Sequence, residues 1–143
     1  MGTVVTTSCG GAFPGTTLGQ QVQSWSRTTG FAASLRTLEA DGRRIAPVEA
    51  EHDPGALRTA CDVLVTDALT ANQNLPTPDS RLTDILTAAY AAAAAAGRDC
   101  LDAAGGGIGL TRAASELDAA STGYVKAQAR LDDIGAVGTG ASS

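Results

Sequence analysis

The stretch LTRAASELDAASTGYVKAQARLDDI, residues 110–134, decides the fold. Its apolar side chains recur at alternating steps of three and four residues, which is the spacing of one buried face on a long helix. They are Leu110, Ala113, Leu117, Ala120, Tyr124, Ala127, Leu131 and Ile134. The pattern predicts a helical bundle, and no stretch of the chain shows the alternation of a β-strand.

A first helical segment covers residues 17–46. Its apolar face shifts at Gly30, where we expect a kink or break, because a glycine inside a helix costs about 1 kcal/mol relative to alanine. Pro47 is expected to end the segment, since proline removes a helical hydrogen bond. The face consists of Leu18, Val22, Trp25, Thr29, Phe31, Leu35, Leu38, Gly42 and Ile45.

Two more helical segments lie between these. Asp53-Pro54 starts one that runs to about residue 73, and Thr77-Pro78 is expected to start the next as cap and first position. Residues 105–109 (GGGIG) end the latter as a helix stop, rather than forming a phosphate loop. The apolar faces are Leu57, Cys61, Leu64, Ala68 and Ala71, then Leu82, Ile85, Ala89, Ala93, Ala96, Cys100 and Ala103.

Composition fits one Ala-rich domain. The 143 residues are 43% hydrophobic, 17% charged and 3% aromatic, with a net charge of −5. An acidic chain without a basic cluster argues against a nucleic-acid-binding surface. The longest uncharged apolar run, residues 85–97, is shorter than the roughly 20 residues that cross a bilayer. We therefore expect an all-α, antiparallel four-helix bundle over residues 18–134.

The two ends of the chain are expected to lie outside this bundle. Residues 1–17 lack periodicity and read as a flexible lead, and residues 135–143 (GAVGTGASS) as a disordered tail. Residues 5–11 (VTTSCGG) resemble the end of a bacterial lipoprotein signal, which makes Cys9 a candidate lipidation site and acyl anchor. The alternative is a disordered leader with an incidental cysteine.

Cys61 and Cys100 each fall on the apolar face of a predicted helix. They are either two inert core thiols or a disulfide, and the count of two core cysteines plus one in the lead favours the disulfide. A short hairpin would place the two sulfurs at different heights along the helices, so pairing requires residues 74–78 to run on along the bundle axis. A disulfide implies an extracytoplasmic location.

Candidates for catalysis and metal binding are few. His52 is the only histidine, and it lies in a polar connector where a solvated side chain is expected. Ser24, Ser26 and Ser34 have no histidine on a neighbouring turn to activate them. The cluster Glu39, Asp41, Glu49, Glu51 and Asp53 lacks the spacing of a calcium loop and is interpreted as a solvated acidic surface. We therefore expect no catalytic residue, no metal site and no cofactor.

Four of the five aromatic residues fall in predicted helices and read as core anchors, with ligand-pocket lining as the alternative. They are Trp25, Phe31, Tyr90 and Tyr124.

Several of these features together resemble a family of uncharacterised extracytoplasmic helical domains of actinobacteria, which occur on small lipoproteins or beside a single membrane anchor. The features span residues 18–134: Trp25, the Phe31…Leu35…Leu38 stretch with Asp41, Ala60-Cys61, Leu75-Pro-Thr-Pro-Asp79, and Cys100 in Ala-rich sequence. The resemblance implies a Cys61–Cys100 disulfide and no established activity. The chain departs from this family at Met1, where the charged and long apolar parts of a signal are missing.

These observations give two functional hypotheses. The first is a non-enzymatic, extracytoplasmic binding module of the bacterial cell envelope, either secreted or held at the membrane only through a lipid anchor. Its partner would be another envelope protein or a small apolar ligand, and not a nucleic acid. The alternative is a cytoplasmic helical regulator or assembly subunit with reduced cysteines.

Overall fold

The computed structural model describes residues 16–136, and this part of the chain is all-α, with five helices and no strand. The expected first segment is divided at Gly30, whose positive φ of 69° ends one helix and starts the next. The break predicted there is confirmed. The helices are α2 (Leu18–Thr29), α3 (Phe31–Ala50), α4 (Pro54–Asn72), α5 (Ser80–Ala104) and α6 (Leu110–Asp133).

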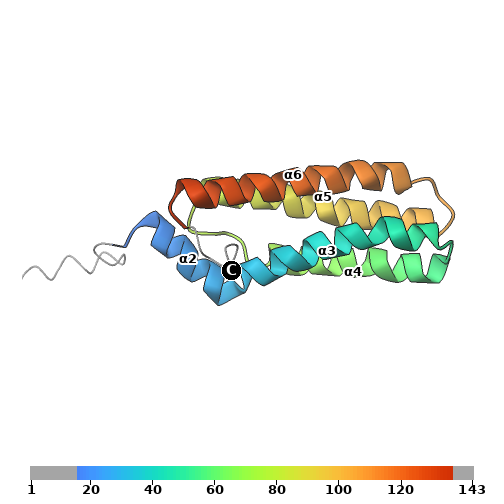
Figure 1. The fold of residues 1–143 in the computed structure, drawn as a ribbon, viewed down its shortest axis with the longest axis horizontal. Coiled ribbons are helices and arrows are strands. Elements are labelled where there is room, and N and C mark those ends of the chain that lie inside the picture. The colour runs from blue at the N-terminus through green and yellow to red at the C-terminus, as the bar shows by residue number, and fades with distance from the viewer. Residues whose placement is uncertain (1–15, 137–143) are drawn as a thin grey trace, which may run out of the picture.

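The four long helices α3 to α6 lie alongside one another, and each reverses the direction of the one before it (Figure 1). The short helix α2 leaves the end of α3 at an angle. Helix α5 packs extensively on both α4 and α6, and α3 packs on α4. By contrast, α3 and α6 touch each other at only a few positions. The four helices therefore pack in the order α3, α4, α5 and α6, as a curled row whose two end members, α3 and α6, face each other but make few contacts.

The core is built mainly from the predicted apolar faces, although they are poor in large side chains. The prediction was wrong for Leu18, which is 36% exposed, and it missed Leu86 of α5, which is fully buried while Ile85 and Ala103 are only partly buried. All the predicted core positions of α4 are buried, as are Ala113, Ala120, Tyr124, Ala127 and Leu131 of α6. Small residues let the helix backbones approach closely. A Cβ on Gly97 of α5 would lie 3.1 Å from the carbonyl oxygen of Cys61, and one on Gly123 of α6 would lie 2.7 Å from the Ala89 Cβ. Close backbone packing therefore compensates for the small volume of the side chains.

Two predicted helix boundaries were wrong. Helix α3 continues through Pro47 to Ala50, because a proline in the last turn removes only one hydrogen bond and already has a helical φ. Helix α5 begins at Ser80 with Asp79 as its cap, rather than at Thr77-Pro78. The Thr77 hydroxyl accepts a hydrogen bond from the Asp79 backbone N–H at 2.9 Å and thereby supports the cap.

Side chains from distant segments join the end of the molecule at which α2 lies. The Trp25 indole Nε1–H donates to the Asn74 carbonyl oxygen at 3.0 Å, and its ring centroid lies 5.1 Å from that of Phe31. Arg130 near the end of α6 donates two hydrogen bonds of 2.8 Å to the two carboxylate oxygens of Asp79. These contacts hold the connector at 73–79 between α2 and the ends of α5 and α6.

Cys61 on α4 and Cys100 on α5 form a disulfide, and their Cα atoms are 5.6 Å apart. Both residues are fully buried. The connector between the two helices, residues 73–79, runs on beyond α4 before α5 begins (Figure 1), as pairing of these cysteines requires. The disulfide therefore links the two central helices of the row.

The described part of the chain has no helix that is both long and apolar enough to cross a membrane. Cys9 and residues 137–143 of the predicted tail lie outside the described residues. The first two residues of that tail are described, and they complete the end of α6: Gly135 has a positive φ of 76°, and the Ala136 N–H donates to the Leu131 carbonyl oxygen at 2.8 Å.

Candidate binding groove between α3 and α6

The line along which α3 and α6 face each other contains two neighbouring hollows of about 260 and 240 Å³. The first is lined by Leu38, Glu39, Gly42, Arg43, Leu117, Asp118, Ala120, Ser121 and Tyr124. The second is lined by Gly42, Ile45, Ala46, Glu49, Leu110, Ala113, Ala114 and Leu117. Because the two hollows share lining residues, they form one groove, which we call the α3–α6 groove.

Gly42 and Leu117 form the neck between the two hollows. A Cβ on Gly42 would lie 3.2 Å from Leu117 Cδ2, so the two helices come close at this point. Any larger side chain at position 42 would extend into the groove. The absence of a side chain at Gly42 therefore keeps the groove open.

The α3–α6 groove has an apolar floor and mostly acidic edges. Its buried members are apolar or aromatic: Leu38, Ile45, Ala113, Ala120 and Tyr124. Its charged members are more exposed: Glu39, Arg43, Glu49 and Asp118. An apolar concavity with a few polar groups at its edge is typical of a binding site.

A third hollow, of about 230 Å³, continues from the groove around the turn between α3 and α4. It is lined by Glu49, His52, Asp53, Pro54, Leu57, Ala103 and Ala104. His52 is exposed, as predicted, and has a positive φ of 57°. Its backbone N–H donates to the Glu49 carbonyl oxygen at 3.1 Å, so the residue shapes the turn.

The three serines considered as nucleophiles are not brought together with His52. They lie on α2 and on the first turns of α3, whereas His52 follows the far end of α3. Ser24 is exposed, Ser34 is partly buried and Ser26 is buried. The structure therefore adds no support for a serine–histidine pair.

The predicted acidic surface is not one surface, and this expectation was wrong for Asp41. Only 4% of Asp41 is exposed, and it points into the interface between α3 and α4. Asp53 has a structural role instead, since its Oδ1 accepts hydrogen bonds from the Gly55 and Ala56 N–H groups as the cap of α4. The remaining acids, Glu39, Glu49 and Glu51, are partly buried or exposed.

Asp41 shares a hydrogen bond with the carboxyl group of Asp67 on α4. Its Oδ2 is buried and has no donor among the described residues. Burial first, and then the hydrogen bond to Asp67 and the negative charge of Asp67, together raise the pKa of Asp41 to about 7, although Arg44 acts in the opposite direction. A hydrogen bond between two carboxyl groups requires a proton on one of them. The pair therefore holds one proton at mildly acidic pH.

A second pair of carboxyl groups links α5 to α6. Burial and a hydrogen bond to Asp99 raise the pKa of Glu116, whose Oε1 has no donor among the described residues. Arg112 lies 3.8 Å from Asp99 and favours the charged form. The described helices thus form two interhelical carboxyl pairs with an arginine close to each.

The sequence analysis missed both pairs, although the spacing contained a signal. Asp41 lies three residues after Leu38 and four before Ile45, so it belongs to the apolar face as much as Gly42 does. Glu116 has the same relation to Ala113 and Ala120. An acidic residue at such a position is a candidate for a buried, protonated carboxyl group.

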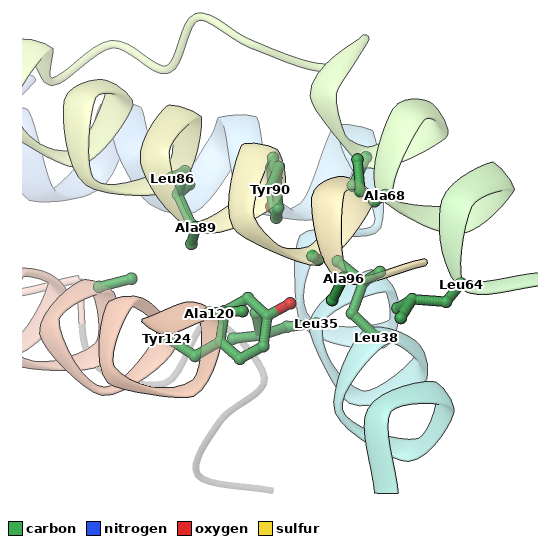
Figure 2. Packing of buried hydrophobic residues seen from close by; sticks show 14 of the residues in the cluster. Leu35, Leu38, Leu64, Ala68, Leu86, Ala89, Tyr90, Ala96, Ala120 and Tyr124 are labelled. Atoms are coloured by element: carbon green, nitrogen blue, oxygen red, sulfur yellow. The ribbon is translucent and has the colours of Figure 1, made fainter. Parts of the chain in front are cut away.

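The four aromatic residues within residues 16–136 are core anchors, as expected, and one of them also lines the groove. Phe31, Tyr90 and Tyr124 are buried, while Trp25 is partly buried. In Figure 2 the Tyr124 ring points from α6 into the core, toward the side on which Leu35 and Leu38 lie. Tyr124 is therefore both a buried core residue and part of the groove lining, which are the two roles that the sequence allowed.

In residues 16–136, no three or more His, Cys, Asp or Glu side chains are placed so that they could hold a metal ion. Comparison with known proteins adds no assignment, since no family model, no curated protein and no solved structure matches the chain. The α3–α6 groove is therefore interpreted from its own residues.

Proposed function

We propose that the chain is a non-enzymatic binding module of the bacterial cell envelope. In this proposal α3 to α6 form an antiparallel four-helix bundle, and α2 extends its first helix past the break at Gly30. The α3–α6 groove takes an apolar part of the partner. The observation that carries the proposal is the open line between α3 and α6, which leaves an apolar floor accessible in an otherwise closely packed molecule.

The chemistry of the groove supports binding. Its second hollow is lined mainly by apolar side chains and offers aliphatic contacts from both helices, with Glu49 as its one charged residue. Apolar surface gains roughly 25 cal/mol for each Å² removed from water, so an apolar occupant of this hollow is favoured. The partner is an apolar segment of an envelope protein or a small apolar ligand.

The disulfide supports the proposed compartment. Disulfides persist in oxidising surroundings and are rare where thiol reductants are abundant. Cys61 and Cys100 are fully buried and bonded across the interface between α4 and α5. An origin in the actinobacterial envelope, with Cys9 as the lipid anchor, is part of the same proposal and rests on the sequence resemblance.

Site-specific photocrosslinking in the native host tests the binding site. A photoreactive amino acid at Ala46 or Ala114, which are exposed residues of the groove lining, is expected to give one discrete adduct. The matched control is Thr66, an exposed residue of α4 outside the groove, which is expected to give none. Equal adducts from all three positions, or no adduct at Ala46 and Ala114, would contradict the proposed site.

The compartment has its own test. Alkylation of the protein isolated from its host without reductant is expected to leave Cys61 and Cys100 unmodified, and alkylation after reduction is expected to modify both. Two reactive thiols in the unreduced sample would instead favour a cytoplasmic regulator or assembly subunit.

A further inference from the structure

Helix α3 is attached to the rest of the row from one side. It packs on α4 and touches α6 at few positions, whereas α5 packs on both of its neighbours. The contacts between α3 and α4 therefore determine where α3 lies. Because α3 is one wall of the α3–α6 groove, the same contacts determine the width of the groove.

The interface between α3 and α4 contains the Asp41–Asp67 pair. Asp41 is almost fully buried and Asp67 is partly buried, so water screens the pair poorly. The buried Asp41 Oδ2 has no donor among the described residues. The hydrogen bond between the Asp41 and Asp67 carboxyl groups therefore depends on a proton carried by one of the two. Without that proton, two negative charges face each other across the interface.

The other groups around Asp41 do not replace this proton. Arg44 on α3 approaches to 4.0 Å, but its side chain is 54% exposed, so its charge is well solvated. From α6, Tyr124 lies within electrostatic reach of Asp41 and of Glu39. From α5, Tyr90 faces Tyr124. Among residues 16–136, Arg44 is therefore the one cation that lowers the pKa of Asp41, and it is largely exposed.

We propose that the Asp41–Asp67 pair is a proton-controlled latch: the shared proton holds α3 against α4, and its loss loosens α3 and changes the width of the α3–α6 groove. The proton moves from the carboxyl pair to solvent, and no other bond changes. The consequence for partner binding rests on the proposed function of the groove, but the latch itself does not.

The direction of the pH effect follows from proton linkage. Burial and Asp67 hold the pKa of Asp41 near 7 in the folded protein, well above the value of about 4 for an unfolded aspartate. The folded state therefore binds the proton more tightly than the unfolded state does. The resulting stability is fully present below about pH 4 and declines as the pH rises toward 7.

The Asp99–Glu116 pair provides an internal comparison. It links α5 to α6, which share the most extensive interface in the molecule. When this pair loses its proton, that packing still holds α5 against α6, and Arg112 beside Asp99 offsets the added negative charge. The latch is therefore assigned to the pair on the weakly attached helix.

Amide hydrogen exchange of the disulfide-bonded protein tests the latch. Protection factors, corrected for intrinsic exchange, are compared between pH 5.5 and pH 8 for α3 and for α5. We expect the opening constant of α3 to rise by up to about tenfold per pH unit as the pH approaches 7, which corresponds to one linked proton. The amides of α5 are expected to change much less.

Two variants assign the effect. In Asp67→Asn the side-chain amide can donate to the ionised Asp41, so α3 protection is expected to become nearly independent of pH. Glu116→Gln, the matched control in the other pair, is expected to keep the pH dependence of α3. Unchanged pH dependence in Asp67→Asn, or protection of α3 that is already independent of pH in the wild type, would overturn the proposal.

A direct titration keeps the proposal testable if Asp67→Asn fails to fold. The side-chain carboxyl ¹³C resonance of Asp41 in the wild-type protein is expected to titrate near neutral pH. A midpoint near 4 would overturn the latch. Failure of the groove crosslinks together with a neutral midpoint would instead refute the proposed function and leave the latch standing.

Discussion

Removal of the Cys61–Cys100 disulfide is expected to lower the free energy of unfolding substantially. The bridge closes a loop of 39 residues, for which the chain-entropy relation gives about 4 kcal/mol. The stability of a domain of this size is typically about 5–15 kcal/mol, so the bridge is a large part of it. The share of the total stability that the bridge supplies is large because the core is rich in alanine and has few large side chains to bury.

The measurement is urea unfolding followed by the fluorescence of Trp25, with and without a reductant. For a domain of this size, m is about 2 kcal/mol/M, so a loss of about 4 kcal/mol moves the midpoint by about 2 M. Comparing oxidised and reduced wild-type protein changes only the link. The variant Cys61→Ala/Cys100→Ala also removes two buried sulfur atoms and is expected to be somewhat less stable than the reduced protein.

A midpoint that moves by less than about 0.5 M on verified reduction would refute this reasoning, since about 2 M is expected for a loop of this length. It would show that residual structure already restricts the unfolded chain after reduction. The bridge would then indicate the compartment, through the alkylation test, without contributing to stability.

Three further predictions concern packing, charge and the groove. Gly97→Val should lower the free energy of unfolding by about 1–3 kcal/mol in thermal unfolding, because the new side chain meets α4. Ala91→Val, on the exposed face of α5, should lower it by under about 1 kcal/mol. Equal losses of stability in the two variants would contradict the close approach of α4 and α5 at Gly97. Arg130→Met should destabilise the protein at neutral pH, because Arg130 pairs with ionised Asp79 and lowers its pKa. In the wild type the stability from this pair is lost as the pH falls below about 4, so the variant should lose less stability in acid. An unchanged decline of stability below about pH 4 in the variant would disprove this. Gly42→Leu should fill the neck of the groove and abolish the crosslink at Ala114 while the thermal midpoint stays the same or rises, and a retained crosslink would place the partner elsewhere.

The helices could be predicted well where periodicity alone determines them. The apolar face of α6 was predicted residue by residue, since it repeats without interruption and small residues on it tolerate close packing. The break at Gly30 was also predictable, because a residue with positive φ is most often glycine. These features depend on the local sequence.

Features that depend on distant partners could not be read in this way. Thr77 and Asp79 are both good capping residues, and the choice of Asp79 depends on Arg130, which lies 51 residues away. The burial of Asp41 depends on which face α4 presents to α3 and on Asp67 meeting it there. The groove depends on how closely α3 and α6 approach, which no single helix determines.

The position of the disulfide also governs how the molecule can move. By joining the second and third helices of the row, it makes α4 and α5 a covalently closed spine with one outer helix on each side. Displacement of α3 then leaves that spine intact, so the free energy of such a motion does not include the contribution of the bridge. The protein can thus be resistant to global unfolding and still yield readily along one edge.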